Sequence, residues 1–241
     1  MTEKLSVDER FRNIEHNLCF INEQIALSAQ KSGRTREDIR LMAVTKTVEP
    51  IFINHAIKCG VDLIGENKVQ EFLSKREYLK LENCEAHLIG HLQRNKVKQI
   101  VPFVSMIQSL DSLKLAKEID SQSEKAGIVS DCLVEVNVGD EENKTGISFD
   151  DVMPLLEEIS RMQHITVSGL MAVPPICEEK AQLLKYFEKM HDLFVDISRQ
   201  NIDNITMRFL SMGMSGDYNE AILCGANMVR VGSSIFGPRL Y

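Results

Sequence analysis

The chain alternates short apolar runs with helical patterns, and this alternation limits the folds that it can adopt. Eight runs rich in β-branched residues follow an N-terminal helical segment. Strands that alternate with helices form parallel sheets, and eight such units in about 250 residues match a closed (β/α)8 barrel. The runs are 41–45, 62–65, 86–90, 104–109, 131–138, 165–172, 205–211 and 228–231.

An open, doubly wound sheet is the rival architecture, because the pattern alone does not show whether a sheet closes. No GxGxxG segment follows the first run, and the sequence has no Walker phosphate-binding motif. We therefore predict a single (β/α)8 TIM-type barrel domain over residues 1–241, with 1–33 as an extra N-terminal helix packed on the barrel. Apolar residues at steps of three and four from Val7 to Ile25 predict that helix.

Helical patterns fill most of the gaps between the runs. Pro50 opens the first of them, at a position where a missing N–H costs nothing. With Asp151 as its N-cap, a later helix would hold Pro154 in the first turn, where proline is tolerated. The predicted helices lie near 50–60, 68–81, 94–101, 112–126, 152–161, 178–200 and 217–224.

Composition excludes several classes of protein. The net charge is -7 with both signs mixed along the chain, so the basic patch of a nucleic-acid binder is missing. No segment approaches the ~18 apolar residues that span a membrane, and we expect a cytoplasmic protein without a membrane partner. The six cysteines form no CxxC pair. We interpret them as buried, structural thiols and predict no metal site.

A lysine closes the first predicted strand, where a barrel places its functional groups. Alternation puts Met42 and Lys46 on one face, and Arg230 and Gly232 on one face of the last strand. Because the first and last strands of a barrel pair, Lys46 and Arg230 would be neighbours. Desolvation and like charge would then lower the pKa of Lys46 and raise its nucleophilicity, as a Schiff-base lysine requires.

The last two strands end in glycine-rich and serine-rich loops. "SMGMSGD" (211–217) offers Ser215 between glycines, and "RVGSS" (230–234) offers Gly232 and Ser233. Barrels frequently bind phosphate with the loops after strands seven and eight. A lysine on strand one that faces such a phosphate cradle is typical of a site for pyridoxal phosphate.

Each feature by itself has a simpler explanation. A lysine at a strand end is most often a snorkelling surface residue, and the glycines could form ordinary turns. Arg230 could equally pair with Glu135 inside the barrel. His87 and His91 are four residues apart, but they have no obvious third ligand. Only the combination of lysine, arginine and phosphate loops favours a functional site.

Several segments also match one family in the same order along the chain. They are "AVTK" (43–46), "GENKVQE" (65–71), "HLIGHLQRNKVK" (87–98), "QSLDS" (108–112), "EVNVGDEENKTGI" (135–147), "GLMAVPP" (169–175) and "LSMGMSGDYNEAILCGANMVRVGSSIFGPR" (210–239). In these segments the chain resembles the pyridoxal phosphate homeostasis proteins. That family consists of single-domain barrels similar to the N-terminal domain of alanine racemase.

The resemblance implies a role for each matching residue. Lys46 resembles the lysine that forms the Schiff base with the cofactor, and Arg230 the partner of its pyridine nitrogen. Ser215, Gly232 and Ser233 resemble the phosphate ligands, and Asn67 and Ser211 would line the same pocket. The family is described as keeping vitamin B6 and amino-acid pools in balance without a confirmed catalytic activity. Its members are mostly cytoplasmic and often monomeric, so we expect a monomer.

The chain departs from the family pattern at a few positions. Ala86 and Leu88 stand where aromatic residues are usual, which bears on packing near strand three. Gly216 replaces a usual acidic residue, and this change could loosen the phosphate loop. Ser233 replaces a usual threonine and keeps the hydroxyl.

The arginine partner favours a carrier over an enzyme. Arg230 stays protonated and has no acceptor, so it would keep the pyridine nitrogen unprotonated and the ring a weak electron sink. Racemisation needs acid-base groups on both faces of the substrate carbon, and Lys46 serves only one. We hypothesise a regulator that holds pyridoxal phosphate as a Schiff base on Lys46 and exchanges it with apo-enzymes. The alternatives are a pyridoxal-phosphate-dependent amino-acid racemase or lyase, and a cofactor-free Schiff-base aldolase.

Overall fold

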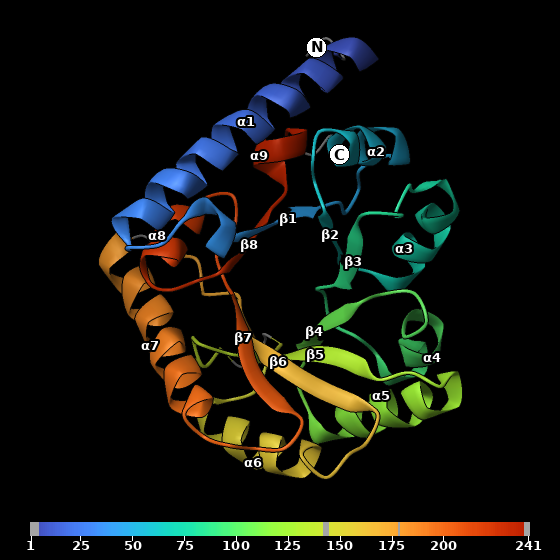
Figure 1. The fold of residues 1–241 in the computed structure, drawn as a ribbon, viewed down its shortest axis with the longest axis vertical. Coiled ribbons are helices and arrows are strands. Elements are labelled where there is room, and N and C mark those ends of the chain that lie inside the picture. Colours follow the sequence, from blue (N-terminus) through green and yellow to red (C-terminus); the bar gives the residue numbers. More distant parts are fainter. Residues whose placement is uncertain (1–4, 142–144, 178, 239–241) are drawn as a thin grey trace.

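The eight apolar runs are the parallel strands of one closed barrel in the computed structural model, which describes residues 5–141, 145–177 and 179–238. Figure 1 shows the strands as a ring with the helices outside it. The strands pair in chain order, and β8 pairs with β1. They are β1 (Arg40–Val44), β2 (Leu63–Glu66), β3 (Glu85–Leu88), β4 (Met106–Leu110), β5 (Ser130–Val136), β6 (Ile165–Ala172), β7 (Ile205–Ser211) and β8 (Met228–Val231).

Pairing between the first and last strands decides the architecture. Met42 is level with Arg230, and Ala43 with Val231, in a parallel ladder. This ladder closes the sheet, so the predicted TIM-type barrel is confirmed and the open sheet is excluded. Five strands begin or end one or two residues away from the predicted runs, while β6, β7 and β8 have the predicted bounds.

The barrel interior is filled by side chains that alternate along the strands. Met42, Leu63 and Met228 form one buried cluster, and Met106, Leu133 and Met171 form a second. Phe209 packs against both clusters. Because Met42 and Met228 share a cluster, the predicted inward faces of β1 and β8 are confirmed. The opposite faces of the strands pack against the surrounding helices in the main core.

The N-terminal helix α1 (Val7–Lys31) crosses the outside of the barrel along α8 and past α9 and α2 (Figure 1). A capping box starts it, in which Ser6 and Glu9 exchange hydrogen bonds with each other's backbone N–H. Its apolar stripe, which includes the buried Ile14 and Ile21, faces the barrel. After the helix, the Arg34 guanidinium donates hydrogen bonds to three carbonyls at the end of α8 and just beyond it.

Helices α2 to α8 lie where the pattern predicts them, with one difference at α6, and α9 is a further short helix that the pattern did not predict. Its N-cap is Ser148, whose hydroxyl accepts from the Asp151 N–H, so Asp151 is not the N-cap and Pro154 lies in the helix interior. Pro154 is exposed, so water can hydrate the carbonyl that it leaves unpaired. These helices are α2 (Pro50–Lys58), α3 (Val69–Lys75), α4 (Val97–Ile100), α5 (Leu113–Ala126), α6 (Phe149–Ile159), α7 (Lys180–Ser198), α8 (Tyr218–Leu223) and α9 (Ser233–Phe236), with short 3-10 turns at Arg36–Asp38, Arg76–Tyr78 and Arg94–Lys96.

The cysteines differ from the prediction. All six are free thiols, but only Cys84 and Cys132 are buried, and Cys19 and Cys59 are exposed. The pattern failed here because Cys59 caps the end of α2, where the chain turns away from the core.

In the part of the chain that the structure describes, no helix is both long and apolar enough to cross a membrane.

Candidate functional site

Lys46 lies just beyond β1, between two threonines whose backbone positions are held by neighbouring elements. The preceding residue, Thr45, is buried, and its hydroxyl donates a hydrogen bond of 2.8 Å to Glu66 Oε1 at the end of β2. The following residue, Thr47, has a φ of 64° and donates its N–H to Glu71 of α3. Lys46 itself is half-buried. Both flanks of the lysine are therefore anchored to the next strand-helix unit.

A second lysine, Lys75, forms hydrogen bonds with several of the groups on both sides of Lys46. Its Nζ donates hydrogen bonds of 2.9 Å to both the Thr45 carbonyl and Glu66 Oε1, and one of 2.6 Å to Glu71 Oε1. Burial raises the pKa of Glu66, and the Lys75 ammonium and the Thr45 hydroxyl oppose that rise. The four side chains form a small network that fixes the turn carrying Lys46.

Arg230 of β8 lies inside the barrel, 4% exposed. Its Nη1 donates to Ser211 Oγ over 2.7 Å, and its Nη2 donates to the Ala172 carbonyl over 2.8 Å. Burial lowers the pKa of Arg230 to about 10, although the charges of Glu135 and Asp217 oppose that shift. The guanidinium therefore stays protonated near neutral pH.

The proposed ion pair between Arg230 and Glu135 does not form among the described residues. Glu135 accepts a hydrogen bond from the Thr145 hydroxyl, and burial raises the pKa of its carboxyl group. Its charge acts on Arg230 only at a distance. Arg230 is thus positioned by a hydroxyl and a carbonyl, and its orientation does not depend on a carboxylate.

The loops after β7 and β8 meet at Ser215. Its hydroxyl oxygen accepts hydrogen bonds from the N–H groups of Gly232, at 3.2 Å, and Ser234, at 3.4 Å. Gly213, with a φ of 92°, lets the first loop turn tightly over α8, because a Cβ there would lie 2.6 Å from Ala221 Cβ. Ser233 is exposed at the start of α9. The two predicted phosphate loops are therefore adjacent.

The same strand pair brings these loops to Lys46. A Cβ on Gly232 would lie 3.2 Å from both Val44 Cβ and the Val44 carbonyl oxygen, so the end of β8 is in close contact with the end of β1. Lys46 is two residues beyond Val44 and therefore beside the loops that are predicted to bind phosphate. Arg230 is level with Met42, deeper in the barrel. Lys46 and Arg230 were expected to be neighbours. They differ in depth, because Arg230 lies further inside the barrel than Lys46 and is not level with it in the strand register.

Asn67 follows β2 at the same end of the barrel and is half-buried. A Cβ on Gly90 would lie 2.2 Å from the Asn67 carbonyl oxygen, so the loops after β2 and β3 are in close contact. The backbone of Asn67 is therefore held at the barrel mouth. Of the predicted residues, Ser211 and Arg230 are joined by a hydrogen bond, as are Ser215 and Gly232.

A chain of hydrogen bonds continues from Arg230 through the barrel interior. Ser211 Oγ, which accepts from Arg230, donates to Gln108 Oε1 at 2.8 Å. Gln108 Nε2 lies 2.9 Å from His87 Nδ1, and His87 Nε2 lies 3.2 Å from Glu85 Oε2. These contacts require a His87 that accepts at Nδ1 and donates from Nε2. Every donor then points from the arginine toward the carboxylate, so the chain is polarised in one direction.

Comparisons with known proteins agree on one family. The family model described as "Alanine racemase, N-terminal domain" matches residues 18–239. A protein of Aquifex aeolicus named "Pyridoxal phosphate homeostasis protein" is 40% identical over 229 residues, which cover 95% of this chain and 100% of that relative. The chain belongs to the pyridoxal phosphate homeostasis protein family.

Solved structures agree with this family assignment. A protein from Bifidobacterium adolescentis, described as "an unknown protein", is 32% identical, with a TM-score of 0.91 over 97% of this chain and 98% of the other. PipY of Synechococcus elongatus, solved with pyridoxal phosphate bound, is 28% identical, with a TM-score of 0.82 over 93% of this chain and 100% of the other. The barrel of this homeostasis family member therefore has the same fold as a cofactor-bound relative.

The hydrogen-bonded chain contains residues that the sequence analysis missed. Gln108 and His87 interrupt apolar strands at positions that alternate inward, and this signal could have identified them. Glu71 and Lys75 are spaced i, i+4 on α3, which predicts a side-chain pair but not its contact with the Lys46 turn. Gln108 and His87 continue the hydrogen bonds of Ser211, and Glu71 and Lys75 bond to the turn that carries Lys46.

Burial of His87 makes stability depend on pH. Desolvation lowers the pKa of this imidazole below its ordinary value of 6.5, although Glu85 opposes the shift. Below pH 6.5 the unfolded chain binds a proton that the folded chain still excludes, so the free energy of unfolding must fall with falling pH. We expect urea unfolding to show this slope from pH 6.5 downward and His87→Gln to reduce it. His16→Gln, at an exposed position, should leave the slope unchanged; a slope that survives in His87→Gln would assign it to another group.

Proposed function

We propose that this chain binds pyridoxal 5'-phosphate as a Schiff base on Lys46 and serves the homeostasis of vitamin B6, and indirectly of amino acids, without a dedicated catalytic activity. The observation that carries the proposal is the contact between the ends of β1 and β8. This contact supports the proposal because the turn of Lys46 follows β1, and the loop of Gly232, which hydrogen-bonds to Ser215, follows the strand that contains the buried Arg230. The cofactor of PipY and the name of the Aquifex relative are consistent with this ligand.

The residues present suit the three reactive parts of the cofactor. An aldehyde needs an amine, which Lys46 supplies from a half-buried position. A phosphate needs hydroxyl and N–H donors. Such groups lie together here, because the N–H groups of Gly232 and Ser234 are within hydrogen-bond distance of the Ser215 hydroxyl. A pyridine nitrogen needs a donor, which the Arg230 guanidinium can supply. We propose Ser233 as a further phosphate ligand, and Asn67 and Ser211 as residues that line the pocket.

The electrostatics of Arg230 favour storage of the cofactor over turnover. When bound, pyridoxal phosphate supplies an electrophilic carbonyl and a ring that can accept electrons. Arg230 keeps its proton near neutral pH, so it donates a hydrogen bond and does not protonate the ring nitrogen. Without that protonation the ring withdraws electrons weakly. The protein's own residues thus hold and orient the cofactor but activate it little.

Exposure of the phosphate loops is consistent with exchange. Ser233 is exposed and Gly232 and Ser215 are half-buried, so solvent can reach the residues that we propose to hold the phosphate. A carrier needs this access, because bound cofactor must leave as well as enter. We propose apo-enzymes that use pyridoxal phosphate as its recipients.

Spectroscopy and transfer together test the proposed function. Protein incubated with pyridoxal phosphate should gain a visible absorption band that persists after desalting, and borohydride should bleach it and leave one cofactor mass on Lys46. The loaded protein should then restore activity to a pyridoxal-phosphate-dependent apo-enzyme. A protein that takes up no cofactor would disprove the proposal. Steady turnover of an amino acid that disappears in Lys46→Ala would replace the carrier function with a racemase or lyase.

A further inference from the structure

Three side chains with metal-binding atoms converge where α1 meets α2, away from the barrel mouth. They are Glu15 of α1, His55 of α2 and Cys59 at the end of α2, and their ligand atoms all lie within 4.8 Å of one another. The nearest pair is His55 Nε2 and Glu15 Oε1, at 2.9 Å. Among the residues that the structure describes, this is the one such group of three.

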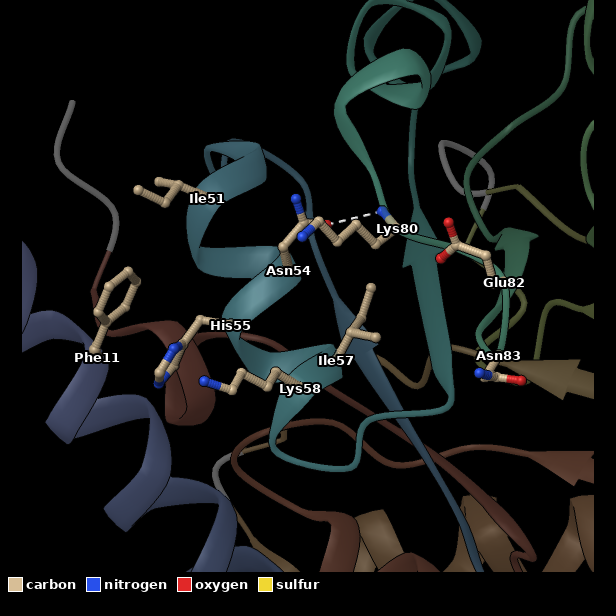
Figure 2. Close-up of a pocket in the computed structure, with 9 residues that line it drawn as sticks. All are labelled: Phe11, Ile51, Asn54, His55, Ile57, Lys58, Lys80, Glu82 and Asn83. Carbon is tan, nitrogen blue, oxygen red and sulfur yellow. Dashed lines mark hydrogen bonds between the residues drawn. The ribbon is translucent and has the colours of Figure 1, made fainter.

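Local structure holds the three side chains in place. His55 and Cys59 are four residues apart, so they lie one turn apart on the same face of α2. The His55 ring stacks on Phe11 of α1, with centroids 4.1 Å apart and an interplanar angle of 14°. Figure 2 shows these two rings between the helices. Because Phe11 and Glu15 are also one turn apart, α1 presents both the stacking ring and the carboxylate to the same imidazole.

A surface pocket adjoins one member of the group, His55. His55, Phe11 and Lys58 line a surface pocket of about 340 Å³ (Figure 2). Water from this pocket can reach the imidazole side of the cluster. Three protein ligands plus one water complete the tetrahedral coordination that zinc prefers.

We propose that Glu15, His55 and Cys59 bind a borderline divalent cation, of which Zn²⁺ is the representative, and that the ion links α1 to α2. The ligand types select this class. A thiolate and an imidazole suit Zn²⁺ and Co²⁺, whereas Mg²⁺ and Ca²⁺ require oxygen ligands. The site is separate from the proposed cofactor site, so it does not depend on the proposed function.

Metal binding at this group must release a proton. The Cys59 sulfur donates a lone pair to the ion, and its thiol proton leaves to solvent. The His55 Nε2 lone pair binds the ion in the tautomer that carries its proton on Nδ1, and Glu15 coordinates as a carboxylate. Because binding requires the thiolate, protons compete with the metal for the Cys59 sulfur at low pH. Affinity for the metal should therefore increase with pH.

Bound metal would strengthen an existing contact between the two helices. Arg10 of α1 already forms an ion pair of 3.5 Å with Glu49, and its guanidinium lies 3.5 Å from the centre of the Phe52 ring. Glu49 directly precedes α2 and follows the turn that carries Lys46. A metal cross-link at the other end of α2 would thus fix the N-terminal helix against the unit that begins with that turn.

Calorimetric titration of the full-length, reduced protein with Zn²⁺, after removal of free cofactor, tests the site. We expect one ion per chain, with affinity that falls about tenfold or more in Cys59→Ser and Glu15→Gln. Co²⁺ should give a thiolate-to-metal charge-transfer band in the wild type that is absent from Cys59→Ser. Zn²⁺ should raise the melting temperature of the wild type and not of Cys59→Ser, and Mg²⁺ should do neither.

A matched control comes from a second pocket, lined by His191, Cys224 and Glu188 among others. It has the same residue types without such a convergent group, so His191→Gln and Cys224→Ser should bind Zn²⁺ like the wild type. Because Cys59 is exposed, its serine variant should fold, which circular dichroism can verify. The proposal is overturned if the protein does not bind Zn²⁺, if Cys59→Ser binds it equally well, or if the Co²⁺ complex lacks the charge-transfer band.

Discussion

Lys46→Ala is expected to abolish covalent capture of pyridoxal phosphate. The variant keeps Arg230 and the loops proposed to bind phosphate but has no amine at the end of β1, so no Schiff base can form with the chain there. We expect no protein-bound visible band after desalting, no borohydride-stable adduct by mass spectrometry, and an affinity lower by about a hundredfold or more. Stability should change by less than about 1 kcal/mol, because Lys46 is half-buried at the end of a strand.

Lys68→Ala is the matched control for this loss. Lys68 is an exposed lysine that follows β2 at the same end of the barrel. Its removal should leave the band, the adduct and the affinity as in the wild type. If Lys46→Ala still yields a borohydride-stable adduct, another lysine is the attachment point. If both variants lose the adduct equally, the loss reflects a general change at the barrel mouth.

Gln108→Leu is expected to lower the free energy of unfolding by about 3 kcal/mol. The Gln108 side chain is fully buried and contacts Ser211 Oγ at 2.8 Å, His87 Nδ1 at 2.9 Å and Met228 Sδ at 3.0 Å. Leucine fills similar space but leaves the Ser211 hydroxyl and the His87 ring without these partners inside the barrel. Urea unfolding at neutral pH measures the change. The cofactor band should also shift, because Ser211 orients Arg230.

Gln122→Leu provides the comparison for this variant. Gln122 is a half-buried helical residue that donates a hydrogen bond to the Glu118 carboxylate on the same helix, so its loss should cost about 0.5 kcal/mol or less. In the double variant His87→Leu with Gln108→Leu, the loss in free energy of unfolding should be smaller than the sum of the losses in the two single variants. Each single change leaves the other side chain without its hydrogen-bond partner. Strict additivity would show that the two side chains are not coupled.

Most of the fold could be predicted from the sequence, because its signals are local. Eight apolar runs separated by helical periods require a parallel sheet, and Pro50 marks the start of α2 as expected. The start of α6 was missed because Ser148 and Asp151 are both good capping residues, and local preference does not choose between them. The exposure of Cys59 was missed because hydrophobic character does not report where a helix ends.

Residues of the candidate site could be predicted only where a reactive or charged side chain lies at or just after the end of a predicted strand. Lys46, Arg230 and Ser215 have reactive or charged side chains at the ends of strands or in the loops that follow them, so they could be named in advance. Gln108 and His87 are neutral residues in the middle of apolar strands, and their partners are far away in the sequence. Lys75 is likewise one of many helical lysines until its contact with the Thr45 carbonyl is seen.

The sequence by itself determined the order of strands and helices, the inward faces of β1 and β8, and the residue types at the strand ends. These follow from hydrophobic periodicity and chain direction, which act between near neighbours. Only the tertiary structure decided closure, which sets β8 against β1, and the depth of Arg230 beneath Lys46. It also decided which buried polar groups satisfy one another. Hydrogen bonds between distant residues depend on distances that no local pattern encodes, because only the packed barrel brings those residues together.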